Sequence, residues 1–82
     1  MDYTAMVNAV KKYIKKRYSY QIINKLKNGR PFIAERKELI KDALPGIDKE
    51  ILELLLEQMH VEGYVIKDDG HTVTFSEGFV FN

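Results

Sequence analysis

The sequence predicts a mainly helical α+β domain of 82 residues, which is too short for two domains. Apolar residues recur at spacings of three and four over residues 2–17 and again over residues 49–62, a pattern typical of amphipathic helices. Asp69-Gly70 separates two short strand-like runs and predicts a β-hairpin. The composition is 45% hydrophobic and 30% charged, which is ordinary for a globular protein and argues against disorder.

The residue types present exclude several classes of site. The sequence has no cysteine, and therefore no disulfide framework, thiolate zinc site or cysteine nucleophile. Its two histidines, His60 and His71, do not stand at a metal-ligand spacing. There is no glycine-rich phosphate loop and no supported catalytic triad, so we expect no enzyme activity, metal or cofactor. Because no apolar run resembles a membrane span or a signal peptide, we expect a cytoplasmic protein.

Charge is distributed unevenly along the chain. The net charge is only +1, yet residues 1–30 carry eight basic groups and one acidic group. Residues 31–82 carry five basic and eleven acidic groups. Such polarity indicates an anionic partner, self-association or internal pairing of the two halves.

The first predicted helix spans residues 2–17 and has one apolar and one basic face. Lys12, Lys15 and Lys16 lie opposite the apolar face, with Lys11 at its border. Arg17 would fall among the apolar residues. The apolar face consists of Tyr3, Met6, Val7, Val10, Tyr13 and Ile14.

Residues 18–28 form a second helical pattern whose apolar stripe is Ile22, Ile23 and Leu26. This stripe is rotated by nearly half a turn from the first one. Either the chain breaks near residues 17–19, with Ser19 as N-cap, or one long helix has two apolar faces. Asn28-Gly29 ends the helix in both cases.

Shorter elements are predicted in the middle of the chain. Residues 30–34 include a proline and indicate a brief edge strand or an extended connection. Residues 35–44 indicate a short helix, and Pro45-Gly46 a turn. That helix is expected to bury Leu39, Ile40, Ala43 and Leu44.

The helix from Lys49 to about Glu62 has the clearest pattern, with Asp48 as N-cap and Gly63 as its stop. Residues 64–66 and 71–75 are the predicted hairpin strands. Residues 76–82 are expected to form a last strand or an extended tail.

Residues 55–66 contain paired leucines, a polar turn, a helix-stopping glycine and an aromatic–aliphatic strand. This stretch resembles the end of the third helix of winged-helix domains, and residues 67–73 resemble the wing. The resemblance covers about residues 18–75. It implies a three-helix core with a two-stranded β-hairpin wing, residues 1–17 being an extra basic helix and residues 76–82 lying outside the domain.

Many winged-helix proteins place the third helix in the major groove of DNA, whereas others bind only proteins. In this sequence the exposed arc of that helix carries Glu50, Glu53 and Glu57, and the wing has Asp68 and Asp69. Carboxylates in these places would repel phosphates, so we do not expect ordinary groove reading. A solvated acidic face is the simpler interpretation.

Our first functional hypothesis is a nucleic-acid-binding accessory protein of DNA replication or transcription regulation. Its N-terminal region interleaves basic and aromatic residues, which suits sequence-independent contact with the phosphates of single- or double-stranded DNA. Tyr13, Tyr18 or Tyr20 would stack on the bases. The alternative is an amphipathic helix with solvated lysines and packed tyrosines. The candidate residues are Lys11, Lys12, Lys15, Lys16, Arg17, Tyr18, Tyr20, Lys25, Lys27 and Arg30.

The second hypothesis is a protein-interaction or dimerisation module. The apolar stripe of Met6, Val10, Tyr13 and Ile14 would contact a protein partner or a second copy. The acidic face of the third helix would then be available to a basic surface. The two hypotheses are compatible, because a dimer would combine two basic helices.

Overall fold

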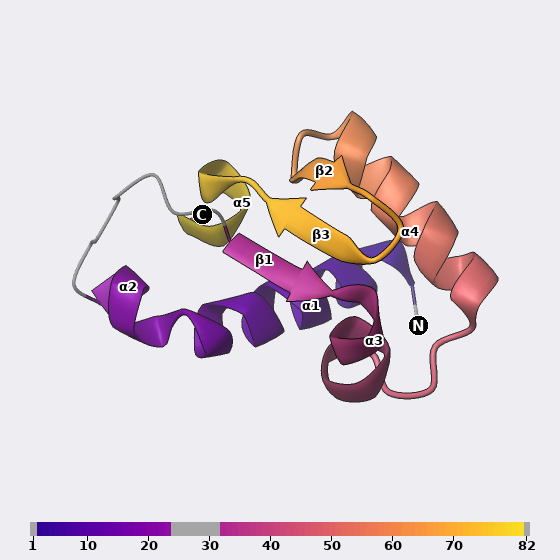
Figure 1. Cartoon of the computed structure of the whole chain (residues 1–82), viewed down its shortest axis with the longest axis horizontal. Helices are drawn as coiled ribbons and strands as arrows, with labels where there is room; N and C mark the ends of the chain where they lie inside the picture. The colour runs from indigo at the N-terminus through magenta and orange to yellow at the C-terminus, as the bar shows by residue number, and fades with distance from the viewer. Residues whose placement is uncertain (1, 24–31, 82) are drawn as a thin grey trace.

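The computed structural model describes residues 2–23 and 32–81. These residues form an α+β fold, as predicted, in which helices surround a small antiparallel sheet (Figure 1). No helix among them is long and apolar enough to cross a membrane. The elements, in order, are α1 (Tyr3–Arg17), α2 (Ser19–Ile23), β1 (Phe32–Glu35), α3 (Arg36–Glu38), η1 (Leu39–Ala43), α4 (Lys49–Val61), β2 (Val65–Asp68), β3 (Thr72–Phe75) and α5 (Glu77–Phe81).

Helix α1 belongs to the hydrophobic core. Its N-cap Asp2 accepts a hydrogen bond of 2.7 Å from the Ala5 amide, and the helix packs against η1, α4 and α5. Val7, Val10 and Ile14 are buried in the common core. The expectation of an extra helix outside a domain of residues 18–75 is therefore wrong, because detaching α1 from the core would expose these side chains at a cost of about 1.5–3 kcal/mol each.

The chain breaks between α1 and α2 at Tyr18, which confirms the two-helix alternative. Tyr18 has a non-helical backbone (φ −109°, ψ 27°). Ser19 is already the first residue of α2 rather than its N-cap. Ile22 is half-buried, whereas Ile23 is exposed. The remainder of the predicted helix, with its end at Asn28-Gly29, lies outside the described residues.

The break brings the Tyr18 side chain to the free edge of the sheet. Its hydroxyl donates to the Ile33 carbonyl and accepts from the Ile33 amide, both at 3.0 Å. Its ring meets Phe32 edge-on at a centroid distance of 5.1 Å. Because β1 pairs only with β3 in the order β1-β3-β2, Tyr18 satisfies backbone groups that the sheet leaves unpaired.

The three strands present one buried face to the helices. Phe32 pairs with Phe75 and Ala34 with Val73, and all four side chains are buried. The predicted strands are confirmed, with shifted ends. The register between β2 and β3 is irregular between Val65 and Lys67.

The predicted helix over residues 35–44 differs in pitch. Only α3 is α-helical, and η1 is a π-helix in which the Leu44 amide bonds to the Leu39 carbonyl at 2.7 Å. Leu39 and Leu44 are buried, as expected, but Ile40 and Ala43 are only half-buried. In an α-helix, Leu39 and Leu44 would differ by about 140° around the axis, because they are five residues apart. The wider π-helical turn brings both side chains nearer to the same side of the helix.

Both predicted ends of α4 are confirmed. The Asp48 carboxylate accepts a bond of 2.8 Å from the Glu50 amide. Gly63 has a φ of +83°, and the following Tyr64 amide bonds back to the Met59 carbonyl at 2.8 Å. The helix thus stops in time for the chain to turn into β2, which packs against it.

The C-terminal residues correct the prediction of a last strand or tail, because they form α5. The Ser76 hydroxyl accepts from the Phe79 amide at 3.1 Å and starts the helix. Phe79 and Val80 are buried, and the Phe79 ring stacks on Phe75 at 5.5 Å. The sequence has adjacent apolar residues here, and one helical turn is enough to bury them against α1.

The hairpin turn is held by its own aspartates. One Asp69 oxygen accepts from the amides of His71 (2.8 Å) and Thr72 (2.7 Å), and the other accepts from the Thr72 hydroxyl at 3.0 Å. Asp68 accepts from the Gly70 amide at 2.9 Å. The hydrogen bonds from the Thr72 and His71 backbone lower the pKa of Asp69 to about 2.

We expect Tyr18→Phe to lower the free energy of unfolding by about 1 kcal/mol, because two hydrogen bonds at the sheet edge are lost while the ring is kept. Urea denaturation measures this. Tyr64→Phe is the matched control, since the Tyr64 hydroxyl makes no hydrogen bond within the described residues, and it is expected to change stability less. Equal effects of the two variants would contradict the role of the Tyr18 hydroxyl.

We expect the Asp69 carboxyl of the folded protein to titrate with a pKa of about 2, against an ordinary pKa of 3.8 in the unfolded chain. Because the folded pKa is the lower one, this contribution to stability is complete above pH 3.8 and is lost as the pH falls towards 2. Carboxyl chemical shifts in an NMR titration give the midpoint. A titration midpoint at or above pH 3.8 would refute the effect of the turn on the Asp69 carboxyl.

Candidate nucleic-acid interface

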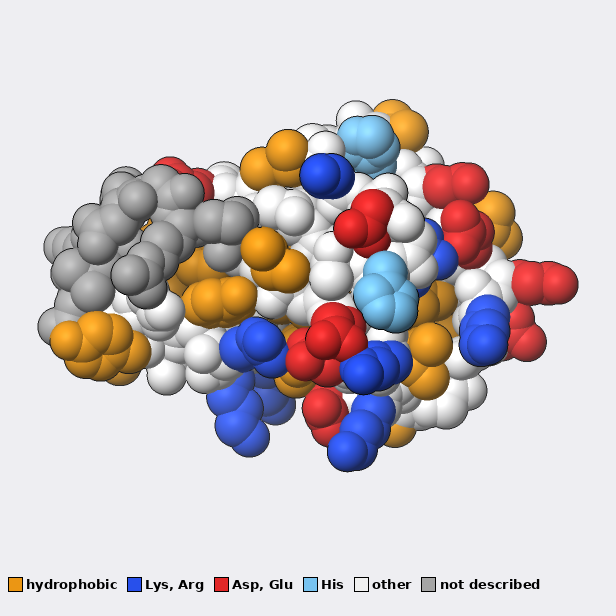
Figure 2. Space-filling view, in the orientation of Figure 1, with side chains coloured by type: hydrophobic (Ala, Val, Ile, Leu, Met, Phe, Trp, Pro, Cys, Tyr) orange, Lys and Arg blue, Asp and Glu red, His pale blue; other side chains and the backbone are white. Residues whose placement is uncertain are grey.

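A groove of about 780 Å³ runs between α1 and η1, and basic side chains line its α1 side. Figure 2 shows Lys and Arg side chains along the lower edge of this view, beneath α1 and α3, with Asp and Glu side chains between them. Lys12 and Lys16 are four residues apart and therefore neighbours on one helix face. The lining consists of Ala9, Lys12, Tyr13, Lys16, Arg17, Asp42 and Ala43.

The lysines of α1 are not paired with carboxylates of the described residues, although Asp42 lies on the opposite side of the groove. None of Lys11, Lys12, Lys15 and Lys16 forms an ion pair within the described residues. Lys11 instead lies over the Phe79 ring, 5.4 Å from its centroid, on the α5 side of the helix. Like charges four residues apart destabilise a helix, although cations in its last turn also favour the helix dipole. The result is a helix face whose lysines form no ion pair within the described fold, with Asp42 as the one carboxylate in the groove lining.

Arg17 and Tyr13 at the end of the groove are held by Glu38. One Glu38 oxygen accepts from the Arg17 guanidinium at 3.0 Å and from the Tyr13 hydroxyl at 3.2 Å. Burial raises the pKa of Tyr13 above its ordinary value, with a smaller contribution from the Glu38 carboxylate. Arg17 is therefore partly neutralised, and it lies beside this polar cluster rather than among the apolar side chains of α1.

The tyrosines proposed for base stacking are placed differently from one another. Tyr13 and Tyr18 are half-buried and bond within the domain, which corrects their assignment as free stacking surfaces. Tyr20, on α2, is 70% exposed. The remaining basic candidates, Lys25, Lys27 and Arg30, lie outside the described residues.

The apolar stripe assigned to a partner is largely used by the domain itself. Val10 and Ile14 are fully buried, and Met6 and Tyr13 are half-buried against the core. The expectation that these four side chains form a docking surface is wrong, because α1 turns this stripe towards η1, α4 and α5.

The acidic face of α4 is exposed as expected, and an unpredicted arginine pairs with part of it. Arg36 donates to Asp68 through Nε (3.2 Å) and Nη2 (2.6 Å), and to Glu53 through Nη1 (2.6 Å). Glu50 and Glu57 form no ion pair within the described part of the chain. No local pattern predicts the role of Arg36, because its partners are 17 and 32 residues away along the chain.

Comparisons with protein-family models, with curated proteins and with solved structures find no match for this chain. Its candidate site is therefore assessed on geometry and charge alone.

We expect Arg36→Lys to lower the free energy of unfolding by about 2 kcal/mol. A lysine ammonium cannot reproduce the planar set of hydrogen bonds by which the Arg36 guanidinium joins α3 to both β2 and α4. Thermal or urea denaturation measures the change. Arg17→Lys is the control, since its single pair with Glu38 is more exposed and is expected to contribute under about 1 kcal/mol. A larger loss in the control would overturn this ranking.

Proposed function

We propose that this protein binds nucleic acid without sequence preference. The groove between α1 and η1 would contact the phosphate backbone of the nucleic acid. One observation carries the proposal: Lys12 and Lys16 lie together in one open groove, and neither has a carboxylate partner within the described residues. Each lysine that neutralises a phosphate releases a condensed counterion, which drives the association.

The rigidity of α1 supports this choice of site. Val10 and Ile14 fix the helix in the core, so its outer face presents cations at constant spacing. A site on a packed helix loses less conformational entropy on binding than a site on a loop. Because Tyr13 and Tyr18 already bond within the domain, the proposal is limited to backbone contact and includes no stacking by these two rings.

We further propose that the domain is of the winged-helix type. The order helix, strand, helix, helix, hairpin supports this, with α1 as the first core helix and β2–β3 as the wing. In that frame α4 would be the recognition helix, yet it exposes Glu50, Glu53 and Glu57. Repulsion from phosphates argues that DNA contacts α1 rather than α4. Such binding suits an accessory factor in DNA replication or transcription regulation.

The test compares two charge reversals of equal size. Lys12→Glu with Lys16→Glu removes the cations of the groove, and Lys49→Glu with Lys67→Glu makes the same change on α4 and the hairpin. Fluorescence anisotropy with labelled single- and double-stranded DNA is recorded at increasing salt. We expect the groove variant to bind at least about tenfold more weakly and to lose about two units of the log–log salt slope, whereas the other variant stays close to wild type.

A third variant and two contrary outcomes complete the test. Asp42→Asn removes a carboxylate from the groove lining and is expected to strengthen binding. If the groove variant, still folded by circular dichroism, binds as wild type does, the proposal is wrong. If the α4 and hairpin variant loses binding instead, DNA is read by α4 and the wing.

A further inference from the structure

Helix α4 exposes an apolar ridge that the core does not use. Ile51, Leu54 and Val61 are separated by three and seven residues and therefore share one side of the helix. Their exposed fractions are 47%, 65% and 81%. Isolated exposed apolar residues are common, but three on one helix face form an apolar stripe of the kind found at interaction sites, although Gln58 lies between Leu54 and Val61.

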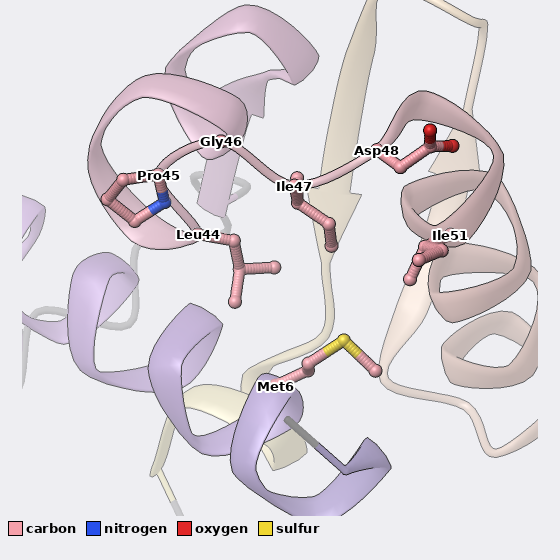
Figure 3. A pocket seen from close by; sticks show the side chains of 7 residues that line it. All are labelled: Met6, Leu44, Pro45, Gly46, Ile47, Asp48 and Ile51. Carbon is pink, nitrogen blue, oxygen red and sulfur yellow. The ribbon is translucent and has the colours of Figure 1, made fainter.

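The ridge continues into an apolar pocket of about 390 Å³ at the start of α4 (Figure 3). In this view Met6 from α1 lies at the bottom of the pocket, below Leu44 and Ile47, and Ile51 from α4 lies at its right-hand side. Ile51 belongs to both features and joins them. A helix laid along α4 would therefore find a ridge and, at one end, a recess for a side chain.

Carboxylates border the ridge. Glu50 and Glu57 follow one side of it and are exposed, without an ion pair among the described residues. Glu62 lies on the other side and accepts a hydrogen bond from Tyr3. Figure 2 shows acidic and hydrophobic side chains together on the right-hand side of this view, over α4. The surface is thus apolar along its centre and mainly negative at its margins, where Lys49 also lies beside Glu50 and Leu54.

These charges select the occupant. A second copy docking through the same face would bring Glu50 and Glu57 towards the same residues of its mate. A second copy docking through α1 would supply lysines, but α1 exposes no large apolar side chain to cover the ridge. Nucleic acid would meet carboxylates. What fits is an apolar stripe flanked by cations.

We propose that the face formed by Ile51, Leu54, Val61, Glu50 and Glu57 binds a basic amphipathic helix of another protein. Leucine-like side chains of that helix cover the ridge and enter the pocket beside Met6, and its lysines or arginines meet the glutamates. This proposal does not depend on nucleic-acid binding, because it uses a different face.

The probe is a fluorescent synthetic helix with leucines on one face and lysines on the other. Two control peptides carry glutamate for every lysine, or the same composition in an order that breaks the apolar stripe. Anisotropy is expected to show binding of the basic amphipathic peptide at least about tenfold tighter than either control. Leu54→Gln is expected to weaken this binding at least about tenfold, since a central apolar contact is lost.

Ile66→Gln is the matched control, because Ile66 is 60% exposed but belongs to β2, and it is expected to leave binding unchanged. Glu50→Gln with Glu57→Gln should weaken binding and reduce its salt dependence.

Peptide binding that Leu54→Gln does not affect would overturn the proposal. So would self-association in sedimentation that Leu54→Gln abolishes, which would make a second copy the occupant. The Leu54→Gln variant should bind DNA as the wild type does. Failure of the peptide-binding proposal can therefore be distinguished from failure of the proposal that DNA binds in the α1 groove.

Discussion

The fold depends on burial of one side of α1. Val7, Val10 and Ile14 insert between η1, α4 and α5, so a helix that carries unpaired lysines on its outer side is fixed by apolar contacts on its inner side. A domain of this size buries a modest share of its surface, and each of these side chains is a large part of its stability. The position of the basic groove and the closure of the core are therefore consequences of the same contact.

Polar side chains connect the elements around that core. Tyr18 completes the hydrogen bonding of β1, Glu38 ties α3 to the end of α1, and Arg36 joins α3 to the hairpin and α4. Each of these groups satisfies charges or backbone groups that would otherwise be unpaired at the margin of a small core. They also decide which candidate residues remain available, since Tyr13, Tyr18 and Arg17 all take part in this network.

Local patterns predicted the elements that depend on local chemistry. Asp48, Gly63 and the Asp69-Gly70 turn act within a few residues of themselves, and the structure confirms them. The local patterns gave wrong predictions where contacts with residues distant in the sequence determine whether a side chain is buried or paired. Val10 and Ile14 looked like a docking stripe because the sequence does not show that α5 and η1 cover them. The π-helical turn and the Arg36 fork depend equally on contacts that no short window contains.

The two charged faces lie on different helices, and this separation gives the molecule a dipole moment. Near a polyanion such a dipole orients the protein before contact, with α1 foremost, over distances of about one Debye length. In that orientation the lysines meet the polyanion, and repulsion disfavours an approach through the carboxylates of α4. A molecule bound in this way would present its ridge to the surrounding solution, so that occupancy of one face leaves the other open for a bridge between two macromolecules.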